Sequence, residues 1–311
     1  MESRKPYLAT LPGLILGCLV CCALWGSAFP CIKIGYELFG IPAHDSASQL
    51  LFAGLRFTLA GALVIVGMST AQRRPLVPQA RDIKPICILS LFQTIGQYFF
   101  FYLGLSHASA MSSSIIEASA NFLAILFAAL AFRTEKLDTA KVLGCMLGFA
   151  GVALVNLSGA DGTFGFTLDG EGFILASTVA GALSTCLIGI FSREHDGVLL
   201  AGWQFLVGGV VLTAIGFLMG GTLSPTEIAP AIALIIYMAL ISAVAYSLWS
   251  RLLAVNPVSR VSVFGFMNPV FGVVLSALLL DEGAGTSPVT VIVALLLVCA
   301  GIIIVNRPKK A

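Results

Sequence analysis

Three charged side chains lie inside long apolar stretches of this sequence: Lys33, Arg56 and Glu117. A charge at the centre of a bilayer costs at least about 2.5 to 3.5 kcal/mol, so a charged residue at such depth is a functional candidate by default. Lys33 lies near the end of its stretch, where its long stem can reach the membrane interface. Arg56 and Glu117 each lie about 8 residues from the end of a stretch, roughly 12 Å deep, so both could act at one level.

A polar stripe surrounds Glu117. Ser113, Ser114, Glu117 and Asn121 follow the i, i+3, i+4 spacing that places side chains on one face of a helix. Polar faces also join helices inside membrane bundles, so packing is the alternative for the two serines, but Glu117 is too costly for packing alone. Together with side chains in other stretches, the expected binding site comprises Glu117, Arg56, Asn121, Gln93, Gln97, Trp25, Tyr98, Tyr246 and Asn268.

The sequence leaves open whether Arg56 and Glu117 touch. A pair in contact would form a dipole suited to a zwitterion such as an amino acid. A separated pair would leave Arg56 to brace helix ends and Glu117 to favour cations. A permanent salt bridge with an architectural role is the third interpretation, because buried pairs can serve structure alone. In the functional interpretations, Glu117 binds a substrate amino group or a proton in turn.

The composition shows which kind of element must position these residues. Of the 311 residues, 58% are hydrophobic and 10% are charged, whereas soluble domains carry about 25% charged residues. The chain is therefore expected to be an integral membrane protein in contact with the lipid bilayer. The 17 Lys and Arg residues nearly balance the 15 Asp and Glu residues, so the charge predicts no nucleic-acid partner.

Ten apolar runs are long enough to cross a bilayer, which predicts an all-α membrane protein with ten transmembrane helices. All Lys and Arg residues except Lys33 and Arg56 fall at the chain ends or in the loops that follow even-numbered runs. By the positive-inside rule, both termini are cytoplasmic in a multi-pass protein of the cell (inner) membrane. The runs are 12–35, 48–69, 85–106, 109–131, 139–158, 171–191, 198–220, 228–250, 258–280 and 287–306.

The two halves of the chain repeat each other. Residues 53–61 align with 201–209 at a shift of 148, with four of nine positions identical, and Asn121 aligns with Asn268 at a shift of 147. Five runs per half is an odd number, so the second half enters the membrane from the opposite side. Inverted repeats are typical of secondary transporters, although a duplication could also persist for structural reasons. The expected repeats are 12–158 and 171–306.

Short motifs along the chain carry a more specific signal. They are Leu24 to Phe29, Leu55 to Phe57, Tyr102 to Leu105, Glu135, Gly144 to Gly151, Asn268 to Gly272, and Asp281 with Glu282. In these motifs the sequence resembles the EamA-type drug/metabolite transporters over 12–306. The resemblance implies two inverted five-helix repeats around a central cavity, with runs 5 and 10 as outer supports and all other runs lining it. It also implies export of amino acids, metabolites or drugs. One departure is Phe122, which stands opposite Pro269 where the family commonly has proline.

Other classes of function fit the sequence less well. No Gly-x-x-x-x-Gly-Lys-Ser/Thr loop is present, so coupling must come from an ion gradient, protons being one candidate, or from the gradient of the substrate itself. An intramembrane enzyme would need a deep nucleophile with a base, and a channel would need a ring of like groups. We therefore expect no enzyme, but a secondary transporter that exports small metabolites such as amino acids or amphiphilic compounds by alternating access. Multidrug or cation efflux by proton antiport is the alternative.

The remaining expectations concern ligands and assembly. Cys18 and Cys21 have the spacing of a metal site, but no second ligand pair lies nearby, so neither a metal nor another cofactor is expected. Glycine pairs such as Gly144 and Gly148 allow close helix approach, mainly within the fold. The chain is therefore expected to be a monomer or a weak dimer.

Overall fold

The computed structural model describes residues 6–105, 107–108, 110–157, 167–279 and 288–307. All regular structure in these residues is helical, which confirms the predicted all-α class. The helices are α1 Leu11–Leu38, α2 Ser46–Gln72, α3 Ala80–Leu89, α4 Gln97–Leu105, α5 Ala110–Leu126, α6 Thr139–Leu157, α7 Glu171–Phe191, α8 Gly197–Leu218, α9 Ile228–Val255, α10 Val258–Ser262, α11 Met267–Leu279 and α12 Pro288–Asn306.

Each of the ten predicted runs contains helix. Nine continuous helical segments of the described residues are long and apolar enough to cross a membrane, and α6 adds a shorter apolar stretch, Thr139–Leu154. The segment Ala80–Leu105 joins α3 to α4, and Val258–Ser276 joins α10 to most of α11. The protein is therefore an integral membrane protein.

Side-chain caps fix where several helices begin. The Asp45 carboxylate accepts a hydrogen bond from the backbone nitrogen of Ser48 (3.1 Å) at the start of α2. Asp196 does the same for Val198 (2.9 Å) at the start of α8. Both caps satisfy amide groups that a helix start leaves without an intrahelical partner.

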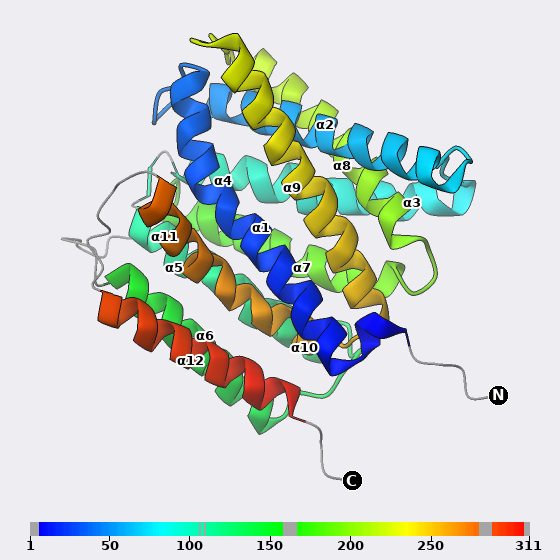
Figure 1. Ribbon diagram of the computed structural model, residues 1–311, viewed down its shortest axis with the longest axis vertical. Helices are drawn as coiled ribbons and strands as arrows, with labels where there is room; N and C mark the ends of the chain where they lie inside the picture. Colours follow the sequence, from blue (N-terminus) through cyan, green and yellow to red (C-terminus); the bar gives the residue numbers. More distant parts are fainter. Residues whose placement is uncertain (1–5, 106, 109, 158–166, 280–287, 308–311) are drawn as a thin grey trace.

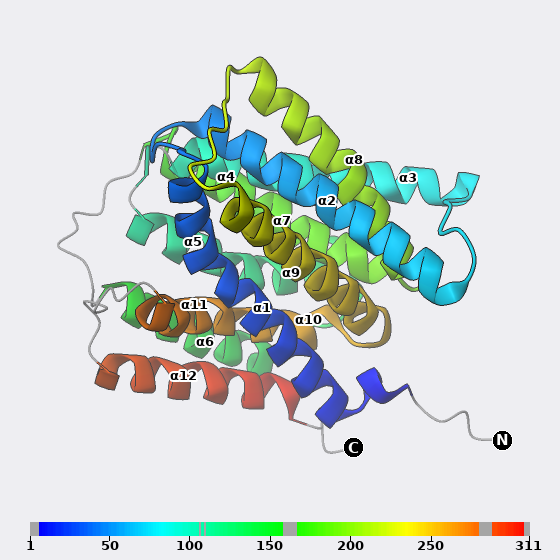
Figure 2. The same cartoon turned by 45° about the horizontal axis from the view of Figure 1, so that its top comes forward.

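Six helix pairs organise the bundle: α2 with α8, α6 with α12, α1 with each of α9 and α11, and α7 with each of α4 and α5. Figures 1 and 2 show α6 and α12 along the lower edge and α2 and α8 toward the upper edge, with the other helices between them. The pair α6 and α12 therefore forms one flank of the bundle, as an outer support would.

Glycines make the α2–α8 crossing close. A Cβ on Gly61 would collide with the backbone nitrogen of Leu206, and a Cβ on Gly209 would collide with that of Thr58. Lipid tails provide no hydrophobic force between helices, so close backbone approach through small residues is what holds such a pair together.

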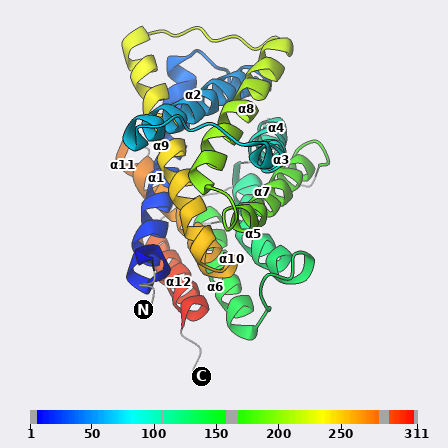
Figure 3. The ribbon, with the colours of Figure 1, turned by 90° about the vertical axis from the view of Figure 1, so that its right-hand side faces the viewer.

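Both described chain ends lie at the same end of the bundle. The Asn256 side-chain amide after α9 donates to the Leu8 carbonyl oxygen (2.9 Å), and Arg260 Nε in α10 donates to Asn306 Oδ1 at the end of α12 (3.0 Å). Figure 3 shows the start of α1 and the end of α12 near each other at the bottom of the view. We call this end of the bundle the terminal end.

Three long helices depart from α-helical geometry. The segment Ser90–Gly96 between α3 and α4 is π-helical, as is Phe127–Ala131 after α5. The segment Val263–Phe266 before α11 is 3-10 helical, and Pro269 follows in the first turn of α11, where a proline is tolerated. Such segments often occur at functional sites, and two of them contribute to the cavity described next.

Candidate functional site

The bundle contains a cavity of about 240 Å³. All nine residues of the predicted binding site line it, from α1, α2, the Ala80–Leu105 segment, α5, α9 and α11. Further lining residues come from α7, but none of those that the structure describes comes from α6, α8 or α12. The expectation that run 7, the present α8, lines the cavity is therefore wrong, because α8 packs behind α2 at the glycine crossing.

The cavity lies in the middle of the bundle and toward the end opposite the terminal end. In α1 the lining residues run from Trp25 to Ile32, past the middle of that helix, and in α4 they extend to Tyr102. Nearer the terminal end, α1 is packed tightly. Its fully buried Cys21 and Cys22 thiols donate to the carbonyl oxygens of Ala245 (3.4 Å) and Phe264 (3.2 Å), respectively.

Arg56 reaches the cavity from α2 without an ionic partner. The residue is only 4% exposed, and its Nε has no hydrogen-bond partner among the described residues. Its guanidinium carbon lies 4.3 Å from the ring centroid of Phe57 and 5.9 Å from that of Tyr98. Aromatic faces attract a cation but leave the N–H donors of the guanidinium unused. A buried guanidinium of this kind can bind an anion that enters the cavity.

Glu117 lines the same cavity from α5, and it does not pair with Arg56. No nitrogen of Arg56 comes within 4.0 Å of a Glu117 oxygen in the described structure. The permanent salt bridge is therefore absent, and Arg56 faces the cavity rather than bracing helix ends. The structure adds an arrangement that the sequence did not suggest: two opposite charges face one cavity without contact.

A chain of aromatic rings forms one wall of the cavity. The ring centroid of Trp25 lies 5.0 Å from those of both Tyr246 and Trp249. The hydroxyl groups of Tyr246 and Tyr98 are 3.2 Å apart. The indole Nε1 of Trp25 is buried without a partner, so the wall combines an apolar surface with a free donor. This combination suits a small molecule with an apolar side chain.

Four side-chain amides complete the polar lining. Gln97 packs against Gly181 in α7, and Asn121 packs so closely against Gly265 that a Cβ there would collide with Asn121 Oδ1. Asn268 Oδ1 is buried without a partner. The fourth amide, Gln93, lies in the π-helical segment Ser90–Gly96.

The sequence analysis missed three hydroxyl groups that line the cavity, those of Ser184, Thr185 and Ser242. The first two donate to the Gly181 carbonyl oxygen (2.8 and 3.0 Å), and Ser242 donates to that of Met238 (3.3 Å). Isolated hydroxyls that bond to their own helix cost little in a membrane, so the sequence contained no charge signal that could have revealed them.

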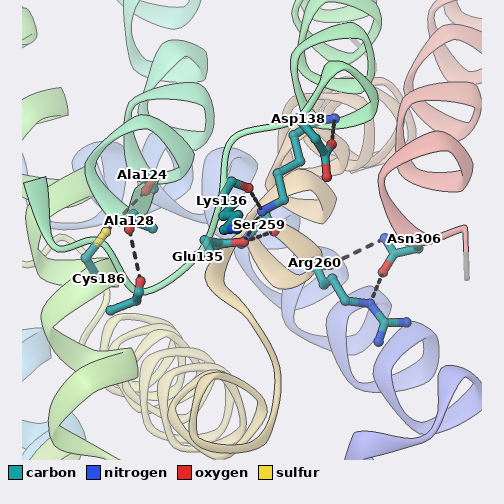
Figure 4. A network of polar contacts seen from close by, with 11 residues as sticks. Ala124, Ala128, Glu135, Lys136, Asp138, Cys186, Ser259, Arg260 and Asn306 are labelled. Carbon is teal, nitrogen blue, oxygen red and sulfur yellow. Dashed lines mark hydrogen bonds and ion pairs between the residues drawn. The ribbon is translucent and has the colours of Figure 1, made fainter. Parts of the chain in front are cut away.

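Polar contacts join different parts of the chain at the terminal end. Figure 4 shows Glu135, which follows α5, beside the start of α10. The Glu135 carboxylate accepts from the backbone nitrogen of Ser259 (2.9 Å), from the Ser259 hydroxyl and from Lys141 Nζ (2.6 Å). The corresponding Glu282 of the second motif lies outside the described residues.

A second contact at the terminal end joins the start of α3 to the α7–α8 turn. Asp82 Oδ1 lies 2.6 Å from His195 Nδ1, and Asp82 Oδ2 accepts from the backbone nitrogen of Gln79 (2.8 Å). Together with the Glu135 contacts, this pair ties distant parts of the chain together at the terminal end.

The fold defines a polytopic helical membrane protein with an internal cavity, and comparison with known proteins shows its family. The chain matches the EamA-like transporter family over residues 11–157 and 168–307. It is 28% identical to the uncharacterized transporter YvbV of Bacillus subtilis (strain 168), over 99% of this chain and 95% of that protein. A solved crystal structure with 20% sequence identity superposes with a TM-score of 0.74, covering 94% of this chain and 95% of the other.

Two further relatives have names that include a substrate. One is a probable terminal-alkyne amino-acid exporter of Streptantibioticus cattleyicolor, 26% identical over 91% of this chain and 90% of that protein. The other is a probable amino-acid metabolite efflux pump of Escherichia coli (strain K12), 26% identical over 85% of this chain and 86% of that protein. The chain belongs to the EamA-like transporter family, which points to a transporter and not to an enzyme.

Proposed function

We propose that this protein is a secondary transporter that exports small zwitterions, in particular amino acids with apolar side chains, across the cell membrane by alternating access. The observation that carries the proposal is the presence of Arg56 and Glu117, unpaired and of opposite charge, in one cavity. An amino acid would place its carboxylate near Arg56, its ammonium group near Glu117, and its side chain against the wall of Trp25 and Tyr246. The names of the amino-acid exporting relatives support this substrate class.

The two inverted repeats belong to the same proposal, and specific contacts support them. At the shift of 148 found in the sequence, Phe57 corresponds to Phe205, and their rings stack at a centroid distance of 5.2 Å. Tyr98 corresponds to Tyr246, and their hydroxyls are 3.2 Å apart. Residues that touch their own repeat counterparts are expected on a two-fold axis between the halves.

The helix pairings support the same symmetry. Under a shift of five spans, the pairing of α1 with α9 and α11 becomes that of α7 with α4 and α5. The glycine contacts behave alike: the contact of Gly61 with Leu206 becomes that of Gly209 with Thr58. We propose that the repeats are 12–158 and 171–306 and that they rock against each other during transport.

The proposed orientation places the terminal end in the cytoplasm, because the basic loops gather there. The cavity then lies toward the outer face, and Glu135 with Ser259 helps to close the cytoplasmic side. Release of these contacts would open the cavity inward, where Glu117 would exchange a proton for the ammonium group of the next substrate. In this scheme, protonation of Glu117 couples transport to the proton gradient.

Transport by the purified protein in proteoliposomes tests the proposal. The probes are phenylalanine, phenethylamine, which lacks the carboxylate, and 3-phenylpropionate, which lacks the amino group. We expect wild-type protein to prefer phenylalanine. Hydrogen bonds to charged groups contribute about 1.5 to 3 kcal/mol, so Arg56→Gln should raise KM for phenylalanine at least about tenfold and spare phenethylamine. Arg251→Gln, which changes an exposed arginine of α9, is the matched control.

Glu117→Gln tests the coupling step, because it keeps the size of the side chain and removes its titration. We expect the variant to lose phenylalanine transport and its dependence on pH. Normal transport with unchanged pH dependence in a well-folded Glu117→Gln protein would exclude the coupling role.

The alternative function is cation efflux by proton antiport, and one observation favours it: Glu117 lies in a partly aromatic cavity without a cationic partner. The same probes separate the two functions. Preference for phenethylamine over phenylalanine in wild-type protein, unaltered by Arg56→Gln, would identify a cation exporter.

A further inference from the structure

We propose that Gln204, which lies outside the cavity lining, is a positioning residue that fixes the side-chain amide of Gln93 with its NH₂ group toward the cavity. Gln93 and Arg56 would then bind the substrate carboxylate together. This inference rests on the proposed transport of zwitterions, and it identifies how the anionic end of the substrate is recognised.

The side-chain amide of Gln204 is engaged on both sides. Gln204 lies in α8, is 1% exposed, and donates through Nε2 to Gln93 Oε1 at 2.7 Å. Its own Oε1 accepts from Thr94 Oγ1 at 2.9 Å. Both ends of this amide are therefore held, Nε2 by Gln93 and Oε1 by Thr94.

The orientation of Gln204 determines that of Gln93. Gln93 lines the cavity, although it is only 3% exposed. Its oxygen is already bonded to Gln204, so the NH₂ group, which also lies beside the Tyr246 hydroxyl, is the part that can serve a ligand. A carboxylate accepts such donors and repels an amide oxygen, so the direction of this single amide decides which end of a zwitterion binds there.

The whole π-helical segment that carries Gln93 is anchored on Gln204. Besides the bond that Gln93 accepts from Gln204 and the bond that Thr94 donates to it, the Ser90 hydroxyl donates to the backbone carbonyl oxygen of Gln204 at 3.1 Å. These three residues belong to Ser90–Gly96, where the departure from α-helical geometry changes the direction of the side chains that follow. Gln204 therefore holds both the amide of Gln93 and the backbone that carries it.

Donors and acceptors come from different groups of helices. Arg56 and Gln93 come from α2 and the π-helical segment, which both pack against α8. Glu117 and Asn268, whose Oδ1 is free, come from α5 and α11. Figures 1 and 2 show α5 and α11 next to α6 and α12, and α2 and α8 in the upper part of the bundle. The cavity thus has a donor side and an acceptor side, as a zwitterion requires.

The repeat gives this arrangement an independent rationale. Gln204 is the counterpart of Arg56 at the shift of 148, and the neighbouring rings of Phe57 and Phe205 stack. A second arginine here would add another buried cation without a partner. In place of a second charge, the second half holds the uncharged Gln204. Its side chain turns away from the cavity and orients the Gln93 donor beside Arg56.

Transport of phenylalanine and phenethylamine in proteoliposomes tests the role of Gln204. In Gln204→Leu, the amide of Gln93 is free to turn, and we expect KM for phenylalanine to rise about tenfold while KM for phenethylamine stays the same. Gln93→Glu keeps the acceptor for Gln204 and removes the donors, so it should cause the same selective loss. The matched control is Gln49→Leu, which removes an equally buried glutamine of α2 whose amide bonds to the Ala43 carbonyl oxygen, away from the cavity.

The outcomes separate the two proposals. A wild-type protein that does not prefer phenylalanine contradicts the proposed function and the carboxylate site with it. A wild-type preference that survives in a folded Gln204→Leu protein overturns the role of Gln204 alone. Equal increases of both KM values in Gln204→Leu would also overturn it, because they would indicate general distortion. If Gln204→Leu fails to fold, Gln93→Glu decides the question by the same comparison.

Discussion

Weakening the contacts of Glu135 should open the terminal end of the bundle. Glu135 lies in the first expected repeat, and Ser259, whose backbone nitrogen and hydroxyl it accepts from, lies in the second. Lys141 Nζ also forms an ion pair with Glu135 at 2.6 Å, and the side chains of these two residues are at most 13% exposed. Water therefore screens these contacts little, and Glu135→Gln would convert the two charge-assisted bonds from Ser259 into neutral ones.

The size of the effect follows from the two contacts with Ser259, because only these join the two repeats. A charge-assisted hydrogen bond exceeds a neutral one by about 1 kcal/mol, so the substitution removes about 2 kcal/mol from the closed arrangement. If an inward-open state breaks both contacts, its population relative to the closed state rises about 30-fold.

Native cysteines report the opening. Cys21 and Cys22 are fully buried in the packed half of α1, whereas Cys87 is exposed and serves as an internal reference. We expect N-ethylmaleimide to label Cys21 and Cys22 much faster in Glu135→Gln than in wild-type protein, measured by mass spectrometry, with Cys87 unchanged. Glu194→Gln, which alters an exposed carboxylate near the same end, should behave like wild type.

A lower melting temperature without faster labelling would refute this reasoning. It would mean that Glu135 stabilises the folded bundle as a whole and does not distinguish a closed terminal end from an open one.

Two further predictions concern close glycine contacts. Gly209→Ala should lower the free energy of unfolding by about 2 kcal/mol, because the new Cβ collides with the backbone nitrogen of Thr58. The control is Gly67→Ala, which has open space around the new Cβ and should leave thermal stability in detergent unchanged. Equal stability of the two variants would contradict the tight α2–α8 crossing. Gly265→Ala should displace the Asn121 side chain from its position and raise KM for phenylalanine several-fold. This increase corresponds to a loss of at least about 1 kcal/mol of binding free energy. An unchanged KM in that variant would show that the position of Asn121 is irrelevant to binding.

Depth in the membrane was predictable from the sequence, whereas the direction of each side chain was only partly so. The lengths of the apolar runs fixed which residues lie in the membrane, and all nine candidate residues line one cavity. The high cost of a buried charge made Arg56 and Glu117 easy to recognise. That these residues bind a substrate stays a prediction, which the transport assays above address.

The arrangement of Gln204 and Gln93 was beyond the sequence because it depends on helix geometry that a 3.6-residue period does not contain. The π-helical segment inserts into an otherwise regular apolar run, and nothing in its composition marks the change. The proposed repeat aligns Gln204 with Arg56, yet the Arg56 side chain lines the cavity and that of Gln204 turns toward Thr94.

The same limit explains why contact between Arg56 and Glu117 could not be decided beforehand. Equal depth places two residues at one level, but whether their helices are neighbours depends on packing elsewhere, here on glycines such as Gly54 and Gly61 that draw α2 against α8. This packing directs Arg56 toward Phe57 and Tyr98 and leaves Glu117 on a different wall. The separation of the two charges is thus a product of helix assembly. It is also what leaves both charges free for a ligand, since a direct ion pair would satisfy each with the other.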